Sequence, residues 1–442
     1  MKKILVLGAG RSSSSLIAYL LANAKQEDWH ITIGDISEKA AEERLSASPH
    51  GKAIHFDVHD EALSKSIIGN ADIVISLLPA HLHLQVAKYC LAFRKHFLNA
   101  SYVSEELKSL HDDALGANLL FMNECGLDPG IDHMSAMQLI NKIKNIGGLI
   151  TSFESFTGGL IAAQTHPENP WRYKFTWNPR NVVMAGQGTA KYLKDGQYKY
   201  VPYQQLFKRV IPVKVSEILF EGYPNRDSLK YVGTYGLHDI KTMIRGTLRN
   251  AGYCSAWNIF VQLGCCDDTY KMEGVEDMTH ADFIGSFIEI PTEISVEERI
   301  CQMFQLTIGS AELQRLRWSG FFSNEKIGLT KGTPAQILEH ILAKKWKLVP
   351  GDKDYIVMWH RLGYLLNGEK KKMLMSLEVE GENEIETAMS KTVGLPLGIV
   401  TKLLLQDKIK QRGVVIPIAQ EVYDPVLLEL GELGIKLTES EM

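Results

Sequence analysis

Short apolar segments alternate with helical patterns through the first third of this chain, and this alternation limits the folds that it can adopt. The apolar segments fall at residues 3–7, 29–33, 53–56, 71–76, 97–100 and 119–122. Short continuous apolar runs are typical of parallel strands that are buried on both faces. Helical patterns such as 80–93 and 104–115 lie between them. The alternation predicts βαβ units and therefore an α/β fold with a Rossmann-type parallel sheet.

The turn after the first predicted strand has the form of a dinucleotide-binding loop. Gly8-Ala9-Gly10 follows the strand and opens a helix, so the backbone can approach a pyrophosphate at the helix N-terminus. Ser13 stands where the usual fingerprint has its third glycine. The cofactor contacts that we expect here are Gly8, Gly10, Arg11, Ser12 and Ser13. The alternative is a tight turn that binds nothing.

Asp35, at the end of the second predicted strand, indicates which cofactor is bound. A carboxylate here can accept hydrogen bonds from both adenosine ribose hydroxyls, and it repels a 2′-phosphate. No arginine follows closely. We therefore predict NAD rather than NADP; the alternative is that Asp35 only caps a turn. The ends of the third and fourth strands add further expected cofactor contacts, which are Asp57, Val58, Leu77, Leu78 and Pro79.

Composition excludes several classes of protein. The chain has 442 residues, 45% of them hydrophobic and 23% charged, with a net charge of −4. These values are ordinary for a soluble globular protein of two or three domains, and nothing indicates a nucleic-acid or membrane-surface binder. The six cysteines fit neither a zinc pattern nor a disulfide framework, and no long apolar run or signal peptide occurs. We expect a cytoplasmic protein with free thiols and no metal site.

Residues 126–133 (GLDPGIDH) combine a rigid bend with concentrated polar chemistry. Proline fixes its φ angle and glycine accepts angles that other residues resist, so Pro129-Gly130 predicts a sharp turn. Rigid polar loops of this kind often form binding sites. We expect Asp132 to be the N-cap of a helix that runs to about residue 146, and His133 to bond locally.

The regular alternation of strand and helix patterns stops after residue 125. The strand pattern at 150–156 is expected to end at Gly158-Gly159, before a long loop over 160–181. A helical pattern at 388–410 is expected to be interrupted at residues 394–396. Further strands are predicted near 198–202, 209–219, 353–361 and 373–380, and helices over most of 252–345.

Several longer motifs are specific to one family. They are residues 73–79 (IVISLLP), 100–104 (ASYVS), 126–133 (GLDPGIDH), 158–160 (GGL), 169–170 (NP), 173–177 (YKFTW), 222–228 (GYPNRDS), 245–249 (RGTLR) and 391–396 (KTVGLP). Together they resemble saccharopine dehydrogenase of the glutamate-forming type, also called saccharopine reductase, over essentially the whole chain.

The resemblance implies a fold, an activity and an assembly. It implies a dinucleotide domain of residues 1–125 and about 390–442, a mixed α/β substrate domain of 126–250 and 346–389, and a mainly helical insertion at 251–345. The implied reaction oxidises saccharopine with water and NAD to glutamate and 2-aminoadipate 6-semialdehyde, or runs in reverse, in lysine metabolism. A homodimer is common in the family and is expected here.

The resemblance also implies site residues. The substrate contacts would be Ser101, Tyr102, Asp128, Arg226, Thr247, Leu248 and Arg249, and Leu127 and Pro129 would touch the cofactor. Arginine forks suit the three carboxylates of saccharopine; a structural salt bridge is the alternative role for Arg226 and Arg249. Asp128 and Tyr102 are the candidates to assist proton transfer, with Asp128 mainly positioning the substrate.

Two departures from the family pattern leave other functions open. Thr157 stands where the family commonly has a cysteine, and residues 161–164 (IAAQ) replace a common Pro-Ala-Pro-Glu run. One alternative is a related imine-forming dehydrogenase, such as carboxynorspermidine synthase. Another is a non-catalytic NAD-binding relative. Two arginines at predicted substrate positions favour a substrate rich in carboxylates.

Overall fold

The structure is a computed structural model that describes residues 1–441, and it divides into two compact units. The first comprises Met1–Gly148 and Ile385–Thr438, and the second comprises Leu149–Glu384 and the last residues from Glu439. The division at residue 148 lies later than the expected boundary at 125. Helix α7 (Ile131–Asn145) belongs to the first unit, where Asn141 donates a 2.8 Å hydrogen bond to Tyr423 on α17 (Gln420–Glu432).

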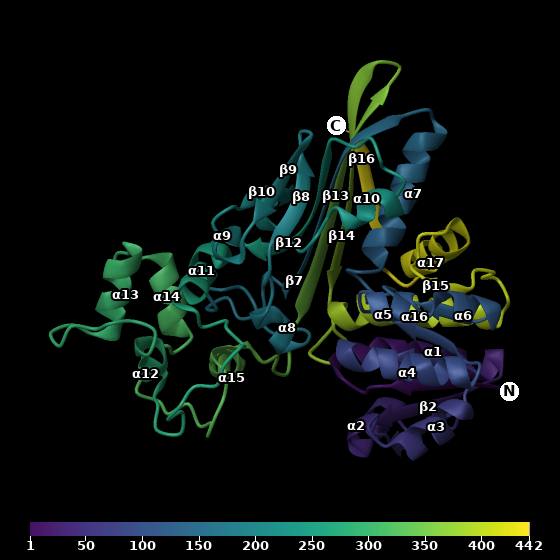
Figure 1. The fold of residues 1–442 in the computed structure, drawn as a ribbon, viewed down its shortest axis with the longest axis horizontal. Coiled ribbons are helices and arrows are strands. Elements are labelled where there is room, and N and C mark those ends of the chain that lie inside the picture. Colours follow the sequence, from purple (N-terminus) through teal and green to yellow (C-terminus); the bar gives the residue numbers. More distant parts are fainter. Residues whose placement is uncertain (442) are drawn as a thin grey trace. The chain divides into compact units, whose positions relative to one another are not determined.

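Within the described residues, the first unit contains a seven-stranded parallel sheet (Figure 1). From edge to edge its strands are β15 (Gly413–Val415), β6 (Leu120–Met122), β5 (His96–Asn99), β4 (Ile73–Ser76), β1 (Lys2–Leu7), β2 (Trp29–Asp35) and β3 (Gly51–His55). The order reverses between β1 and β4, as in Rossmann folds, whose ligands bind where the order reverses. The predicted parallel sheet is confirmed, and all six of its predicted strands are present.

Helices cover both faces of this sheet, as its buried strands require. They are η1 (Arg11–Ser13), α1 (Ser14–Glu27), α2 (Glu38–Leu45), α3 (Glu61–Gly69), η2 (Ala80–Leu82), α4 (His83–Ala92), α5 (Glu105–Lys108), α6 (His111–Gly116), α7, α16 (Ala388–Leu405) and α17. In the described chain, α16 is the one helix long and apolar enough to cross a membrane, and 78% of it is buried inside the fold.

The expected interruption of α16 is wrong, because the helix continues through Pro396. Its glycines serve helix packing instead. A Cβ atom on Gly394 would lie 2.8 Å from the backbone nitrogen of Leu16, and one on Gly398 would lie 2.5 Å from Tyr19. Both contacts are to α1, so the glycines let the two helices approach closely.

The second unit contains a mixed sheet, as predicted. Its strand order is β10 (Ile211–Val215), β11 (Ile218–Pro224), β12 (Thr242–Asn250), β7 (Leu149–Ile161), β13 (Asp354–Leu366), β14 (Glu369–Glu380) and β16 (Leu437–Glu441), with β8 (Ala190–Lys194) and β9 (Gln197–Val201) attached through β12. The expected end of a strand at Gly158-Gly159 is wrong, since β7 runs through both residues. A Cβ atom on Gly158 would lie 2.8 Å from the Leu248 carbonyl oxygen, so this glycine allows β12 to approach closely.

Eight helices within the described part of the second unit accompany this sheet, and most of them gather in the green segment of Figure 1. They are α8 (Pro179–Val183), α9 (Tyr203–Leu206), α10 (Lys230–Thr234), α11 (Tyr253–Leu263), α12 (His280–Gly285), α13 (Val296–Phe304), α14 (Ala311–Trp318) and α15 (Pro334–Trp346). Their core is rich in aromatic rings: Trp171 stacks on Phe260 and meets Trp346 edge to face.

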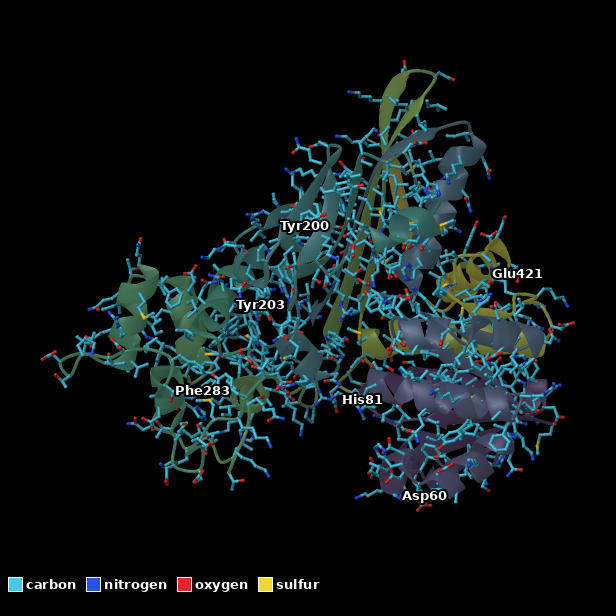
Figure 2. All side chains as sticks on the ribbon, viewed as in Figure 1. Asp60, His81, Tyr200, Tyr203, Phe283 and Glu421 are labelled. Carbon is cyan, nitrogen blue, oxygen red and sulfur yellow. The ribbon has the colours of Figure 1, made fainter. Side chains whose placement is uncertain are left out.

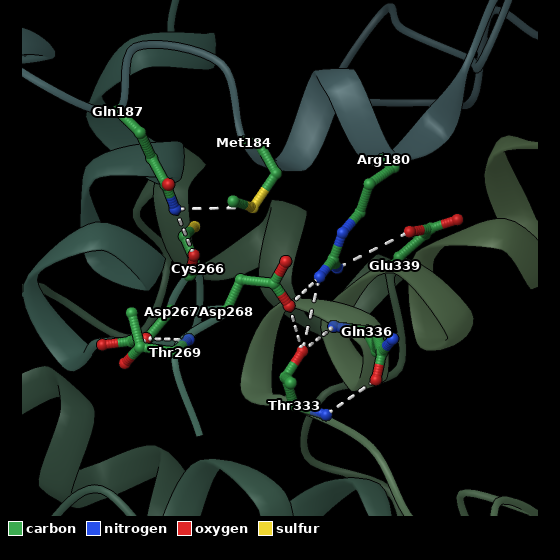
Figure 3. A network of polar contacts seen from close by, with 10 residues as sticks. All are labelled: Arg180, Met184, Gln187, Cys266, Asp267, Asp268, Thr269, Thr333, Gln336 and Glu339. Atoms are coloured by element: carbon green, nitrogen blue, oxygen red, sulfur yellow. Dashed lines mark hydrogen bonds and ion pairs between the residues drawn. The ribbon is translucent and has the colours of Figure 1, made fainter. Parts of the chain in front are cut away.

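A polar network joins α8 to the start of α15 (Figure 3). Arg180 on α8 forms an ion pair with Asp268, and Thr333 donates a 2.6 Å hydrogen bond to the same carboxylate. Thr333 is also the N-cap of α15, and with Gln336 it forms a reciprocal capping box. The network therefore fixes the entry of α15 and the loop that contains Asp268.

Candidate functional site

The glycine turn lies at the point where the strand order of the first sheet reverses. Gly8 has φ +104°, and a Cβ atom there would lie 3.1 Å from the backbone of Leu77, at the end of β4. A Cβ atom on Gly10 would meet nothing within 4 Å. The turn therefore has open space on the Gly10 side, at the entrance to η1 and α1. This arrangement fits a bound pyrophosphate.

The three residues after Gly10 have different surroundings. Arg11 is exposed and Ser12 is half-buried, so neither side chain is enclosed by the fold. Ser13 is buried, and its hydroxyl donates a 2.8 Å hydrogen bond to the Gly10 carbonyl. Ser13 therefore stabilises the turn from inside, in the position of the missing third glycine.

Asp35 also organises the turn. One of its carboxylate oxygens accepts a 2.7 Å hydrogen bond from the Ala9 N–H, and the other accepts a 2.9 Å bond from the Ser37 N–H. The side chain of Arg44, on α2, donates longer bonds of 3.4 Å to the carbonyls of Ala9 and Gly10. A carboxylate and a guanidinium thus both contact the backbone of this turn.

The other predicted cofactor residues follow strands β3 and β4. The Asp57 carboxylate accepts a 2.9 Å hydrogen bond from the His59 N–H, and the Val58 carbonyl accepts one of the same length from Gln85. Leu77 and Leu78 are half-buried and Pro79 is exposed. All five residues follow β3 or β4, so they lie at the carboxyl ends of the strands, as the glycine turn after β1 does.

The bend at residues 126–130 requires glycine at its last position. Gly130 has φ +147°, and a Cβ atom there would lie 2.0 Å from the Gly126 carbonyl oxygen. The Asp128–Pro129 peptide bond is cis, and Gly126 donates a 2.9 Å hydrogen bond to the Pro129 carbonyl. Leu127 and Pro129 are buried, whereas Asp128 is half-buried. The closed bend therefore leaves the Asp128 side chain as its accessible polar group.

The expectation that Asp132 is a helix N-cap is wrong. The N-cap of α7 is Gly130, and Asp132 lies within the first turn. Its carboxylate accepts a 2.6 Å hydrogen bond from the Gly130 N–H, so it closes the bend from the helical side. His133 makes a 2.8 Å contact with Glu124, a residue that precedes the bend rather than an immediate neighbour.

The structure brings Tyr102 and Asp128 together. The Tyr102 hydroxyl donates a 3.0 Å hydrogen bond to an Asp128 carboxylate oxygen. Glu124 accepts a 3.1 Å bond from the Val103 N–H, and a Cβ atom on Gly126 would touch Ala100 at 2.9 Å. The segment that follows β5 and the bend that follows β6 are thus tied together, and they hold the two candidate proton-transfer residues in contact.

In the second unit, Arg249 lies in a box of aromatic rings. Its side chain is 4% exposed, and its guanidinium carbon is 5.1 Å from the Tyr173 ring centroid, 5.2 Å from Tyr253 and 5.9 Å from Tyr223. Burial raises the pKa of Tyr223 to about 12 and that of Tyr253 well above its ordinary value. The tyrosines are therefore neutral near pH 7, and none supplies a negative charge.

No carboxylate pairs with Arg249 among residues 1–441. Its Nη1 donates a 3.0 Å hydrogen bond to the Leu248 carbonyl, and its Nε has no partner. Among the described residues, the buried oxygens of Tyr173 and Tyr223 also lack a full hydrogen bond; Trp177 and Thr247, which lie near them, each oppose the rise in pKa that burial causes. A buried charge without a counter-ion is costly. The box is therefore suited to an anionic ligand, and a carboxylate fits an arginine fork.

The remaining predicted substrate residues differ in accessibility. Arg226 is exposed in the turn after β11, with φ +51°, and its carbonyl accepts a 2.8 Å hydrogen bond from the Lys191 N–H. Thr247 is half-buried and is paired in register with Thr157 on β7. Leu248 is fully buried, so its side chain belongs to the core. Thr157 has a buried hydroxyl without a partner in the described chain.

Sequence reasoning missed several residues that build these sites. Glu124 braces the bend, Arg44 lies on the glycine turn, and Tyr253 closes the Arg249 box. Arg44 acts on residues that are distant along the chain. Glu124 and Tyr253 lie nearer to their partners, but neither belongs to a recognisable local motif. Lys174, inside the YKFTW motif, is buried in an ion pair with Asp352 at 2.6 Å, so this part of the motif has a structural role.

Two family models together match nearly the whole chain. The model described as "Saccharopine dehydrogenase NADP binding domain" matches residues 4–122, and "Saccharopine dehydrogenase C-terminal domain" matches residues 126–435. These matches confirm the family that the motifs indicated. They agree with the Rossmann-type first unit, whose strands β1 to β6 lie within residues 2–122.

Relatives cover the chain from end to end. It is 31% identical over 448 residues to saccharopine dehydrogenase (NADP+, L-glutamate-forming) of Saccharomyces cerevisiae, which covers 99% of both chains. It is 34% identical over 447 residues to mitochondrial alpha-aminoadipic semialdehyde synthase of Bos taurus, matching 99% of this chain and 47% of that protein. The chain thus spans about half the length of this mammalian relative. The apo structure of the yeast enzyme superposes with a TM-score of 0.89 at 30% identity and covers 100% of both chains.

The expectation of NAD is contradicted by these comparisons. The model over residues 4–122 is an NADP-binding domain, and fungal relatives are named for NADP+. In the structure each oxygen of Asp35 accepts a backbone N–H of the turn. This geometry matches the alternative role of Asp35 as a turn cap, and Arg44 adds a cation that contacts the carbonyls of the same turn.

Proposed function

Because the chain belongs to the saccharopine dehydrogenase family, we propose that it interconverts saccharopine with glutamate and 2-aminoadipate 6-semialdehyde, using water and NADP, in lysine metabolism. The observation that carries this proposal is the Arg249 box. A buried guanidinium without a protein counter-ion is a site for a substrate carboxylate, and saccharopine carries three carboxylates.

The residues that we assign to the substrate are Ser101, Tyr102, Asp128, Arg226, Thr247 and Arg249, with Leu248 contributing through its backbone. The arginines bind carboxylates, and the Asp128 carboxylate accepts a hydrogen bond from the substrate's secondary amine. Asp128 is suited to this role because Tyr102 orients it while part of it stays accessible.

The reaction requires proton transfers around one carbon–nitrogen bond. The secondary amine must lose a proton before the neighbouring carbon gives up hydride, and water then adds to the resulting imine. Asp128 and Tyr102 form one hydrogen-bonded pair, so a proton on the amine can pass to Asp128. We assign Asp128 mainly to positioning and Tyr102 to holding its carboxylate.

The glycine turn supports the cofactor assignment. Gly8, Gly10, Arg11 and Ser12 would hold the pyrophosphate, with Ser13 and Asp35 fixing the turn. The half-buried Arg44, whose guanidinium contacts the carbonyls of the glycine turn, would accommodate the 2′-phosphate of NADP. When bound, the oxidised nicotinamide accepts the hydride. Leu77, Leu78, Pro79, Leu127 and Pro129 would lie on the nicotinamide side.

Absorbance at 340 nm tests this function directly. Purified protein with saccharopine is expected to reduce NADP at a higher kcat/KM than NAD. A preference for NAD would overturn the cofactor assignment alone, whereas the absence of saccharopine-dependent reduction with either cofactor, across a range of pH, would overturn the function. Activity with carboxynorspermidine in place of saccharopine would identify the related dehydrogenase instead.

We also propose a homodimer on the family resemblance, for which light scattering would give twice the 49.5-kDa chain mass.

A further inference from the structure

A buried chain of hydrogen bonds reaches Ser101 from the interior of the first unit. The Ser76 hydroxyl at the end of β4 lies 3.0 Å from His83 Nδ1, and His83 Nε2 lies 2.9 Å from the Ser101 hydroxyl. Ser76 and His83 are buried, whereas Ser101 is half-buried. His83, the first residue of α4, thus links the first sheet to a residue that we assign to the substrate.

The backbone of Ser101 is fixed independently of His83. Its N–H donates a 2.8 Å hydrogen bond to Asn99 Oδ1, and its carbonyl accepts a 3.1 Å bond from the Glu124 N–H. Asn99 in turn donates a 2.6 Å bond to Asn123. With the backbone held in this way, the Ser101 side chain can still turn about its Cα–Cβ and Cβ–Oγ bonds, and His83 is the group that contacts its hydroxyl.

The imidazole of His83 is neutral. Burial, and secondarily the nearby His81, lower the pKa of His83 to about 4. His81 is exposed on the η2 turn that precedes α4 (Figure 2). A neutral imidazole has one N–H donor and one acceptor nitrogen. The chain from Ser76 to Ser101 can therefore run in one of two directions.

Ser76 decides between these directions. Among the described residues, its buried hydroxyl has His83 Nδ1 as its only hydrogen-bond partner. If Nδ1 carried the hydrogen, the Ser76 hydroxyl hydrogen would be buried without an acceptor, at a cost of about 1–3 kcal/mol. The favoured arrangement therefore has Ser76 donating to Nδ1. Nε2 then carries the hydrogen and donates it to the Ser101 oxygen.

We propose that His83 is a positioning residue that makes Ser101 a hydrogen-bond donor toward a carboxylate of the substrate. Because Nε2–H occupies a lone pair of the Ser101 oxygen, the Ser101 hydrogen is directed away from His83. A carboxylate only accepts hydrogen bonds, so it binds Ser101 in this arrangement and would be disfavoured in the reverse one. The inference rests on the proposed function, through the assignment of Ser101 to the substrate.

Steady-state kinetics with saccharopine and NADP test the role of His83. His83→Phe keeps a buried ring but removes both nitrogens, and we expect it to raise the KM for saccharopine about tenfold, as for the loss of one hydrogen bond to a charged group. The KM for the cofactor should change less than about twofold. His83→Gln, whose amide can still donate to Ser101, should recover most of the loss. His81→Gln is the matched control and should behave like the wild type.

A double-mutant cycle separates positioning from a structural effect. We expect His83→Phe to add nothing to the KM increase of Ser101→Ala. Additive losses, or an equal rise in the KM for the cofactor, would overturn the proposal. An unchanged KM for saccharopine in Ser101→Ala would also overturn it, while saccharopine turnover by the same preparation would leave the proposed function standing.

The tautomer of His83 gives a test that does not depend on activity. Nitrogen-15 NMR of histidine-labelled protein, with the His83 signal assigned by its loss in His83→Gln, should show hydrogen on Nε2 and none on Nδ1 at pH 7. Hydrogen on Nδ1, or a charged imidazole, would overturn the proposal even if His83→Phe fails to fold. Ser76→Ala removes the group that selects the tautomer and should raise the KM for saccharopine as well.

Discussion

Arg249 holds a positive charge inside a box of neutral tyrosines, so its side chain is expected to lower the stability of the ligand-free protein. A buried ion without a partner destabilises the protein that contains it, so replacing it by an apolar residue of similar length is often neutral or stabilising. Its aromatic contacts, at 5.1–5.9 Å, offset part of that cost but provide no counter-charge. An anionic ligand that pairs with this guanidinium would explain why the charge is buried.

We therefore expect Arg249→Met to leave the Tm of the ligand-free protein unchanged or higher, while raising the KM for saccharopine by about 100-fold, as for the loss of a charged bidentate contact. Thermal unfolding and 340-nm kinetics measure the two effects. Arg361→Met is the control: Arg361 pairs with Glu154 at 2.6 Å, so its loss should lower the Tm without changing the KM. A large fall in the Tm of Arg249→Met would indicate a structural role instead.

Replacing Asp128 distinguishes substrate positioning from general-base catalysis. It is half-buried and accepts the Tyr102 hydrogen bond at 3.0 Å. If it mainly holds the substrate amine, Asp128→Ala should raise the KM for saccharopine about tenfold or more, with a smaller fall in kcat. A collapse of kcat with an unchanged KM would identify a general base. Tyr102→Phe should cause a weaker change of the same kind, since it removes only the orienting hydrogen bond.

At the scale of elements, the start of α15 depends on Thr333. Its hydroxyl accepts the Gln336 N–H at 3.3 Å and donates to Asp268 at 2.6 Å, so one side chain caps a helix and joins the network of Figure 3. We expect Thr333→Ala to lower the free energy of unfolding by about 1–2 kcal/mol and to speed hydrogen exchange in the first turn of α15.

Ser295→Ala is the matched control for Thr333. Ser295 and Glu298 form the same kind of capping box on α13, but their hydrogen bonds are exposed. A smaller loss of stability is expected, because water can replace the missing bond. Equal losses for the two variants would show that the Asp268 network adds nothing to the cap.

Local sequence patterns predicted helices and strands correctly where a single physical cause produces the pattern. The strands of the first sheet were predicted correctly because continuous apolar runs require burial on both faces. The patterns failed at Gly158 and at residues 394–396, where glycine and proline normally end an element. There the glycines allow β12 and α1 to approach closely, which is a contact between distant segments.

At the scale of the whole molecule, two neutral histidines, of which one is buried and one half-buried, predict a pH dependence of stability. Burial lowers the pKa of both His83 and His96 to about 4, and for His96 the charges of Arg412 and Lys2 contribute. In the unfolded chain a histidine titrates near 6.5. The unfolded state therefore binds more protons between these values, and stability falls as the pH decreases through this window, by about 1.4 kcal/mol per pH unit for each proton.

Urea unfolding at pH 7.5, 6 and 5 measures this loss. His96→Asn keeps an acceptor for the Leu120 N–H, which now donates to His96 Nδ1 at 2.9 Å, and cannot be protonated. We expect its stability to depend less steeply on pH than that of the wild type. If the stability of His96→Asn fell with pH as steeply as that of the wild type, His96 would be protonated as easily in the folded protein as in the unfolded chain.

The sequence by itself determined the fold class, the family and the identity of the polar loops, because buried strands, a glycine turn and contiguous motifs are local properties. Tertiary structure decided what individual side chains do. It placed both oxygens of Asp35 on backbone N–H groups, moved Asp132 from a helix cap to a brace of the bend, and surrounded Arg249 with three tyrosines. Some of these partners are close in sequence and others far apart, but the folded backbone decides which groups meet, so no local pattern specifies them.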